Sequence, residues 1–406
     1  MSEEHRHSLP DDIPEGILSE VLLGALESIP RSDQRRRGEL YVRGLLTVAG
    51  KKTMRALADG AGNSVEQSLY QFITKSTWRN GPVRRAMARL TTRRIAPRAW
   101  VVHPLVITKV GTHSVGVERQ WVPYLGRVVN CQQAMGVWLA SDQGSCPVDW
   151  RLALPECWTD DERRERASIP GHVASCPPER CAVGAVTRMA SVWGLPERPV
   201  VMDVRDGDAY AVSAELTDLR VPFVLRIDPA TRFAPAAPPR TPSGGEQVGP
   251  ASGLTAALGR ACLPVEWYDH TTDTVRATSV GATRVRLHRR AGPPSRADRR
   301  ELMLLGAWTD RGRRVPGEYW LSNLSGAQLG TVYRTAMLTR RVARDQEEVT
   351  DALGARDFEG RSFRGWHHHM TMVTVAHAAH ALTRSAQAAE ARAAVRERRL
   401  KAVPAA

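Results

Sequence analysis

The chain has 406 residues, which is longer than an average domain, and its 42% of apolar residues is enough to bury two or three hydrophobic cores. No apolar run approaches the roughly 18 residues that span a bilayer, and the first residues lack the layout of a secretion signal, so we expect a cytoplasmic protein with no membrane segment. The formal net charge of +14 favours a polyanionic partner such as nucleic acid, because each neutralised phosphate releases counterions. A GC-rich genome that inflates arginine is the alternative explanation.

Two groups of residues invite a metal site, and the sequence favours it at neither. Cys176 and Cys181, with His172 nearby, match no common zinc spacing, and the six cysteines of the chain are expected to be reduced thiols. Residues 367–369 are three consecutive histidines. Adjacent residues of a helix point about 100° apart and cannot together chelate one ion.

The first hundred residues are predicted to be helical. Apolar spacing predicts helices over 17–29 and 35–48, followed by a helix, a glycine-rich turn and a second helix over 53–75. This layout is compatible with a helix-turn-helix DNA-binding unit, and the alternative is a helical bundle that only supports the core. In the DNA-binding interpretation, bases are read by one exposed face of the second helix, through Gln67, Gln71 and Lys75.

Two arginine-rich segments are candidates for contacts with DNA phosphates. The first is a predicted helix over 78–98, with Arg84, Arg85 and Arg89. The second lies among strand-like segments over 265–268, 282–288, 301–308 and 318–322, and carries Arg284, Arg286, Arg289 and Arg290. The alternative role for these arginines is solvation of exposed elements.

Residues 110–158 combine strand-like alternation with specific sequence words. THSVGV at 112–117, LG at 125–126 and NCQ at 130–132 resemble the GKHSVGVARQ…LGKVANCQ signature of bacterial insertion-sequence transposases of the DDE superfamily. LALPECW at 152–158 resembles the LYLPEEW word of the same group, which is closest to insertion-sequence family seven-zero-one. The resemblance implies a ribonuclease-H-like α/β core in which three carboxylates hold two Mg²⁺ or Mn²⁺ ions that cut and join DNA.

The three carboxylate positions of that family are mostly replaced in this chain. Counting back from the signature, the first catalytic aspartates fall on His103 and Pro104. The second position matches Asp203, which ends a predicted strand over 199–203, where open α/β sheets present site residues. Without the resemblance, Asp203 would be read as a helix cap or turn former. The word at 354–372 resembles the family's GLDHYEVRRYDAWYRHITL, and counting back places Ala343 on the catalytic glutamate.

We therefore expect an α/β fold with a ribonuclease-H-like core, interrupted by a β-rich insertion and preceded by an N-terminal helical DNA-binding region. The expected regions are 1–99 (helical region), 100–228 (first segment of the core), 229–325 (β insertion), 326–385 (second segment of the core) and 386–406 (basic tail).

The expected function is binding of double-stranded DNA by a catalytically inactive pseudoenzyme, domesticated as a transcription regulator and associated with the nucleoid, without metal or cofactor. A homodimer is left open. The alternative is an active transposase in which Asp206, Asp345 or Glu347 replaces a lost carboxylate, with Mg²⁺ or Mn²⁺ as cofactor. A relic without selected activity is the third hypothesis.

Overall fold

The computed structural model describes residues 13–58, 63–236, 248–256, 258, 261–288, 297–310 and 315–401. Its N-terminal region is helical, as predicted, and consists of α1 (Glu15–Leu26), α2 (Ser32–Thr47), α3 (Met54–Leu57), α4 (Asn63–Thr74) and α5 (Asn80–Ile95). These helices bury a shared apolar core that includes Leu22, Val42 and Phe72. The glycine-rich turn expected between α3 and α4 lies largely outside the described residues.

The centre of the molecule is the first half of a long mixed sheet. Its strands are β1 (Ala99–Thr108), β2 (Glu118–Val122), β3 (Arg127–Ala140), β4 (Ser145–Ala153), β5 (Val200–Asp203) and β6 (Phe223–Arg226). β3 pairs antiparallel with β1, β2 and β4, whereas β5 and β6 run parallel to β1. Helices α6 (Asp161–Ala167), α7 (Pro178–Ser191) and α8 (Ala209–Asp218) connect these strands. This mixed α/β arrangement is compatible with the expected ribonuclease-H-like core.

Two strand boundaries in this half were predicted wrongly. Residues 116–133 and 136–140 were expected to form two strands. Instead, a 3-10 turn (Pro123–Leu125) divides the first range into β2 and β3, and β3 continues through Gly136 to Ala140. Gly136 is not a strand end: a Cβ at this position would lie 2.8 Å from the rings of Trp138 and Trp150, so the glycine is needed for close packing. Strand β4 was missed, because Asp149 at its centre made the segment look like an exposed connection.

The predicted β-rich block follows and continues the same sheet. It contains β7 (Arg232–Pro235), β8 (Gly249–Pro250), α9 (Ala251–Ala256), β9 (Leu263–Asp269), β10 (Thr274–Leu287), β11 (Leu302–Trp308) and β12 (Glu318–Ser322). The four expected strand segments are confirmed within β9 to β12. β12 pairs antiparallel with β6, so the block extends the core sheet from its β6 edge.

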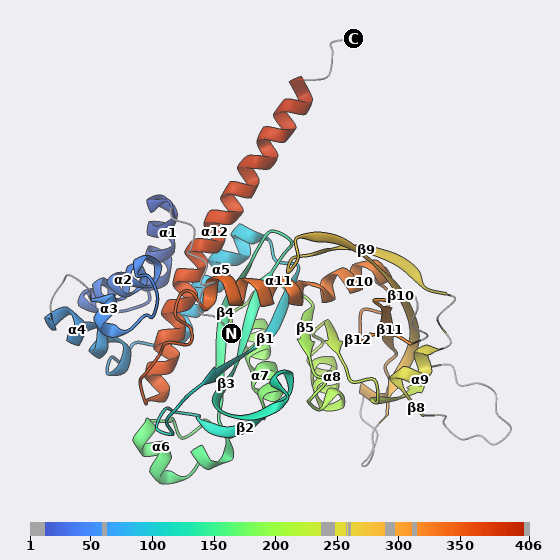
Figure 1. Ribbon diagram of the computed structural model, residues 1–406, viewed down its shortest axis with the longest axis horizontal. Coiled ribbons are helices and arrows are strands. Elements are labelled where there is room, and N and C mark those ends of the chain that lie inside the picture. Colours follow the sequence, from blue (N-terminus) through green and yellow to red (C-terminus); the bar gives the residue numbers. More distant parts are fainter. Residues whose placement is uncertain are drawn as a thin grey trace.

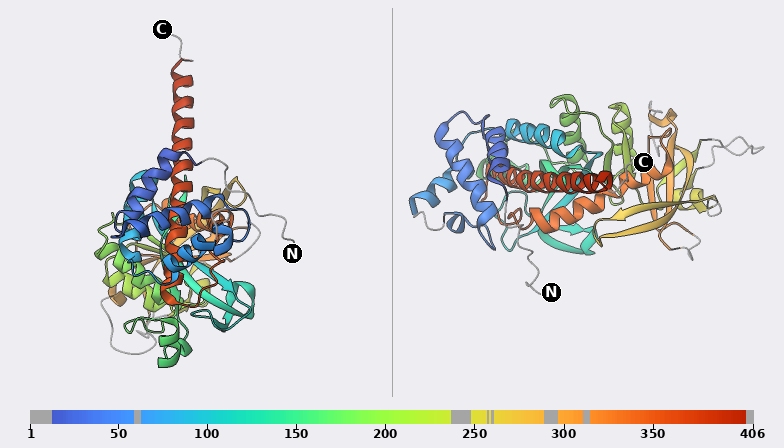
Figure 2. Two further views of the ribbon diagram at one scale, coloured as in Figure 1. Left: turned by 90° about the vertical axis from the view of Figure 1, so that its left-hand side faces the viewer. Right: turned by 90° about the horizontal axis from the view of Figure 1, so that it is seen from above.

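The chain then returns to the core through α10 (Leu329–Ala336), α11 (Leu338–Asp345), a π-helical turn (Gln346–Thr350) and α12 (Phe363–Lys401). Residues 329–350 thus form three consecutive helical pieces rather than one continuous helix. Figures 1 and 2 show the N-terminal helices at one end of the molecule, the β-rich block at the other, and α12 beside the N-terminal helices.

Helix α12 is buried over residues 366–383, and its later turns project into solvent. It packs against α1, α2, α4, α5 and β4, so this half is buried on all sides, including its histidines and threonines. Among the described residues, no helix is both long and apolar enough to cross a membrane.

Candidate functional site

The site implied by the resemblance lies where β1 and β5 run side by side. Parallel pairing joins Trp100 with Val200 and Val101 with Val201, and the same register brings His103 level with Asp203. Burial lowers the pKa of the half-buried His103 to about 4; Asp203 opposes this shift and Arg356 adds to it. His103 is therefore a neutral imidazole at neutral pH, at the place where the family carries an aspartate.

Asp203 is held by a neighbouring guanidinium. Nη2 of Arg205 lies 2.7 Å from Oδ2 of Asp203, and Nε lies 3.0 Å from Oδ1. The backbone N–H of Arg205 also donates to Oδ1, at 3.1 Å, and Nη1 of Arg226 lies 3.8 Å from Oδ2. The hydrogen bond to Asp203 raises the pKa of Arg205. Both oxygens of the one retained carboxylate thus have a cationic partner within the chain.

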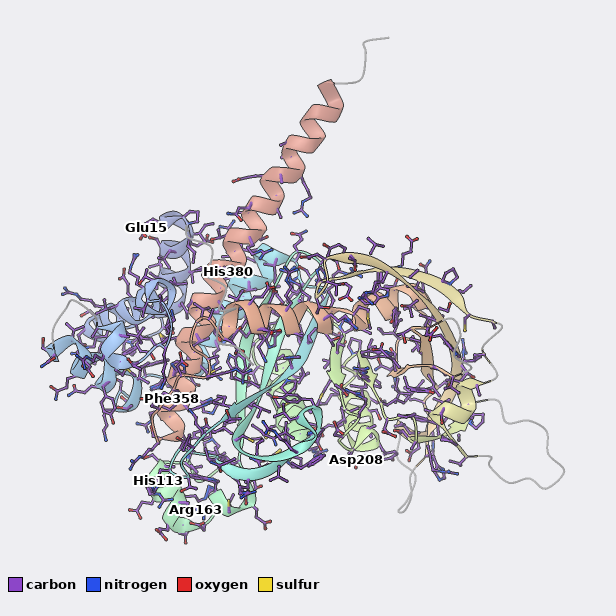
Figure 3. All side chains as sticks on the ribbon, viewed as in Figure 1. Glu15, His113, Arg163, Asp208, Phe358 and His380 are labelled. Carbon is purple, nitrogen blue, oxygen red and sulfur yellow. The ribbon has the colours of Figure 1, made fainter. Side chains whose placement is uncertain are left out.

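Of the two structural alternatives, helix cap and turn former, Asp203 fits the second, because its Oδ1 accepts from the backbone N–H of Arg205 two residues on. The cap of α8 is Asp208, whose carboxylate accepts from the backbone N–H of Ala211 at 2.9 Å. Figure 3 labels Asp208 at the end of α8, beyond strand β5. The side chain of Asp203 is 36% exposed and stands at the open end of its strand.

The third position lies on α11, which packs against β1 and β5. Nε2 of Gln346, directly after α11, donates to the backbone oxygen of Pro104 at 3.2 Å, so this end of the helix meets β1 next to His103. Ala343 precedes Gln346 by about one turn and shares its face. A half-buried methyl group therefore stands at the position that the resemblance assigns to a glutamate.

The neighbouring acidic residues do not complete a metal site. Asp345 is buried and faces β4, where it accepts from the backbone N–H of Ser145 at 2.9 Å and from Nε of Arg341 at 2.8 Å, so it does not face the candidate site as the active-transposase alternative would require. Asp206 and Glu347 are exposed. Among the described residues, no group of three or more His, Cys, Asp or Glu is arranged to hold a metal ion. Mg²⁺ and Mn²⁺ favour several oxygen ligands, and the residues present do not fit them.

The exposed face predicted on α4 is present. Gln67, Gln71 and Lys75 are all exposed, while Leu69, Phe72 and Ile73 on the opposite face are fully buried. This pattern leaves a polar helix face open to a partner. Base reading by these three side chains stays a prediction.

Arg84 is not on the DNA-facing surface, so that expectation is wrong. Its side chain is 3% exposed, and its Nη1 lies 2.9 Å from Oδ1 of Asp149 on β4. Nε donates to Oγ1 of Thr371 at 2.8 Å, and Nη2 donates to the backbone oxygen of His367 at 2.9 Å. Burial lowers the pKa of Arg84 to about 10, and Asp149 opposes the shift, so the guanidinium stays charged.

The helical spacing could have revealed the buried position of Arg84. Arg84, Met87, Ala88 and Thr91 follow the i, i+3, i+4, i+7 pattern of a core-facing stripe, and all four are buried. Sequence reasoning counted arginines along α5 without asking which face each one occupies. The consequence was that Asp149, the partner of Arg84, was also missed.

The remaining candidate arginines differ in their solvent exposure and in the partners they already contact. Arg85 is half-buried, and Arg89 is exposed and donates to the backbone oxygen of Trp193 at 3.2 Å. Arg284 and Arg286 on β10 both pair with Glu301, at 3.3 and 3.4 Å, so some of their charge is offset. Arg289 and Arg290 lie outside the described residues.

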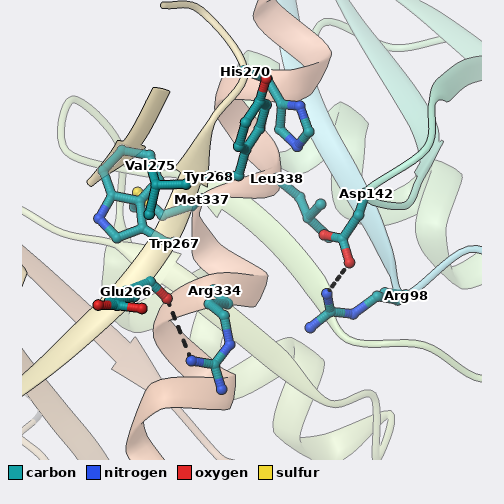
Figure 4. Close-up of a pocket in the computed structure, with 10 residues that line it drawn as sticks. All are labelled: Arg98, Asp142, Glu266, Trp267, Tyr268, His270, Val275, Arg334, Met337 and Leu338. Carbon is teal, nitrogen blue, oxygen red and sulfur yellow. Dashed lines mark hydrogen bonds and ion pairs between the residues drawn. The ribbon is translucent and has the colours of Figure 1, made fainter. Parts of the chain in front are cut away.

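Two cavities lie between the β-rich block and helices α10 and α11. Figure 4 shows the smaller one, about 270 Å³, with Trp267 and Tyr268 from β9 facing Leu338, and with Arg98 paired to Asp142 at 2.5 Å at its side. The larger one, about 490 Å³, shares Trp267 and is bordered by Arg226, the second cation beside Asp203.

A protein-family model described as DDE superfamily endonuclease matches residues 25–290, which is more than half of the chain. The chain belongs to this family. The match runs from the N-terminal helices through β1 and β5, and so includes His103 and Asp203 of this DDE-superfamily chain. No curated protein sequence matches it significantly. The family implies DNA as the class of partner.

Proposed function

We propose that this DDE-superfamily protein derives from an insertion-sequence transposase and binds double-stranded DNA without cutting it. The observation that carries the proposal is the two-pronged contact of Arg205 with Asp203, at 2.7 and 3.0 Å. A guanidinium supplies, on the one retained carboxylate, the positive charge that a divalent ion would supply in an active relative.

The chemistry of the other two positions points the same way. Phosphoryl transfer by two metal ions needs several carboxylate oxygens to fix both ions. His103 offers a neutral nitrogen, and nitrogen suits softer metals than Mg²⁺. Ala343 offers no ligand atom. With one carboxylate of three left, and that one already paired, the site lacks the means to hold two ions.

Binding of DNA is supported by charge and by the exposed faces. The net charge is +14, and α4 and α5 carry exposed polar and basic side chains that include Gln67, Gln71, Arg89 and Arg93. Phosphate contacts from such arginines give affinity, and side chains such as glutamine give base preference. A role in transcription regulation, as a monomer or a homodimer, is the natural extension of DNA binding without cleavage.

An active transposase is the second candidate function. The observation that favours it is the exposure of Asp206 and Glu347 near the ends of β5 and α11. For activity, Arg205 would have to leave Asp203, and both exposed carboxylates would have to turn into the site.

The proposed DNA binding is tested by fluorescence anisotropy with genomic fragments of its own host, at several salt concentrations. We expect affinity that falls steeply with salt and a preference among fragments that survives competitor DNA. Replacing Arg89 with Glu should weaken binding to all fragments by the same factor, whereas Gln67→Ala or Gln71→Ala should change which fragments bind most tightly. A flat salt response, or equal affinity for all fragments, would contradict the proposal.

A further inference from the structure

The sequence signature that led to the family forms a hairpin at the border of the candidate site. β2 and β3 pair from Glu118 with Cys131 to Val122 with Arg127, and a 3-10 turn (Pro123–Leu125) joins them. The hairpin packs on β1 through a small apolar cluster of Val106, Val122 and Cys131. It lies along the lower side of the core strands in Figure 1.

One guanidinium connects this hairpin to the site. Arg356 donates to the backbone oxygen of Val106 on β1 and pairs with Asp351 at 2.9 Å. It lowers the pKa of His103 and opposes the rise that burial causes in the pKa of Tyr124. The geometry agrees: the strand β1 that carries His103 also carries Val106, which packs against the hairpin and accepts the hydrogen bond from Arg356. The hairpin therefore borders the site.

The outer surface of the hairpin is apolar and aromatic. Trp121 is 57% exposed and Tyr124 is 64% exposed, and Val128, which is paired with Trp121 in the strand register, is 49% exposed. Solvent-exposed aromatic rings that gather on one element mark a binding surface, since water gives them no stabilisation.

Charge identifies the partner of this surface. Arg119 lies two positions from Trp121 on β2 and so shares its outer face, and Arg127, which is paired with Val122, is exposed beside the turn that carries Tyr124. Aromatic rings flanked by arginines bind unpaired nucleotides, because bases stack on the rings while the cations contact phosphates. An apolar protein partner would leave both guanidinium groups desolvated without a counter-charge.

We propose that the β2–β3 hairpin is a stacking platform, on which Trp121 and Tyr124 receive unpaired bases of the DNA that lies over the candidate site. This inference rests on the proposed DNA binding and adds a specific class of substrate to it: DNA with an unpaired or distorted segment. Arg119 contacts a phosphate on the face that carries Trp121, and Arg127 contacts a phosphate beside the hairpin turn.

The test compares the affinity of the full chain for two DNAs of the same sequence, an intact duplex and a duplex with a three-nucleotide unpaired bulge. Stacking of a base on an aromatic ring contributes about five- to a hundredfold in affinity. We expect the bulged DNA to bind about tenfold tighter. Trp121→Ala and Tyr124→Ala should each remove most of this preference, and Trp121→Phe should keep some of it. Leu263→Ala, at an apolar side chain that is 59% exposed on β9, is the matched control and should change nothing.

The outcomes separate this inference from the proposed function. If the duplex binds but Trp121→Ala and Tyr124→Ala leave the preference for bulged DNA intact, or if no preference exists, the stacking platform is contradicted and DNA binding survives. If neither DNA binds, both proposals fail. If Trp121→Ala instead turns a dimer into a monomer in light scattering, without changing DNA affinity, the hairpin is an interface between two copies and the inference is overturned. Circular dichroism of each variant checks that these exposed substitutions leave the fold unchanged.

Discussion

Arg84 and Asp149 form an ion pair inside the protein, with Nη1 of the arginine 2.9 Å from Oδ1 of the aspartate and neither side chain more than 3% exposed. The pair joins α5 to β4, and the further hydrogen bonds of Arg84 to Thr371 and His367 add α12. The N-terminal helices and the core sheet therefore meet at one buried guanidinium.

Removal of this guanidinium should destabilise the protein strongly. Arg84→Ala leaves Asp149 buried with weaker compensation, and loss of one partner of a buried pair costs about 3–5 kcal/mol. Urea denaturation followed by circular dichroism measures the free energy of unfolding. Arg93→Ala, at an exposed position of the same helix, is the control and should cost less than about 0.5 kcal/mol. An Arg84→Ala protein of unchanged stability but weakened DNA binding would show that Arg84 contacts phosphate after all.

Stability should fall as the pH falls from about 6.5 to 4, partly because of buried histidines. Burial lowers the pKa of His377 to about 4, against the opposing effects of Asp345 and the backbone of Ser145. Below pH 6.5 the unfolded chain binds a proton at this residue while the folded chain does not, so protonation favours unfolding. Each such histidine contributes up to about 1.4 kcal/mol per pH unit in this window.

Replacement of His377 isolates its share of that slope. In His377→Gln the free energy of unfolding should fall less steeply between pH 6.5 and 4, by up to the slope that one bound proton gives, about 1.4 kcal/mol per pH unit. Urea denaturation at half-unit pH steps measures the slope of each protein. His113→Gln, at an exposed side chain, should leave the slope as it is in the wild type. Equal slopes for wild type and His377→Gln would mean that the buried ring is already protonated in the folded state.

Asp203→Ala should tighten DNA binding. Without Asp203, the side chain of Arg205, which is 44% exposed, loses its partner and becomes free to contact phosphate. We expect the affinity for duplex DNA to rise two- to threefold. The logarithm of the affinity should also fall more steeply with the logarithm of the salt concentration, by the amount that about one additional phosphate contact gives. Anisotropy titrations at four salt concentrations provide both values. In the Asp203→Ala/Arg205→Ala double variant the gain should disappear; a gain that persists would point to a cause other than Arg205.

Much of the fold follows from the sequence, because the determining signals are local. Apolar periodicity located α1, α2 and α4, and the family words assigned His103 and Asp203 to two positions of one site, which the pairing of β1 with β5 brings together. The errors came from residues whose role depends on distant partners. Asp149 looked like a loop residue because its counter-charges come from α5 and α7, and Gly136 looked like a strand end because the two tryptophans it accommodates lie elsewhere in the sheet.

The candidate site was predictable in its positions and unpredictable in its contacts. The resemblance to the family predicts which positions correspond to the carboxylates, but the pairing of Arg205 with Asp203 depends on the turn that follows β5. Similarly, Asp345 was a plausible substitute ligand by sequence distance. Its direction toward Ser145 on β4 depends on how α11 packs on the sheet.

Manganese should not stabilise the wild-type protein through the candidate site. A ligand that binds the folded state raises the melting temperature by mass action, and paired Asp203 alone gives the ion too few ligands. Thermal melts with and without millimolar MnCl₂ should coincide, whereas His103→Asp/Ala343→Glu/Arg205→Ser, which restores the carboxylates and removes the competing cation, should gain stability. A rise in the wild type that Asp203→Asn abolishes would contradict the absence of a metal site.

The most direct test of the central claim is cleavage of DNA by the purified protein. A labelled duplex that carries its preferred binding fragment is incubated with MgCl₂ or MnCl₂, and products are resolved on a denaturing gel beside the Asp203→Ala variant. The account predicts that neither protein nicks or joins strands, although the wild type binds the duplex under the same conditions. Metal-dependent strand breakage by the wild type that is lost in Asp203→Ala would contradict this prediction. It would show that Arg205 releases the Asp203 carboxylate, which then binds a metal ion.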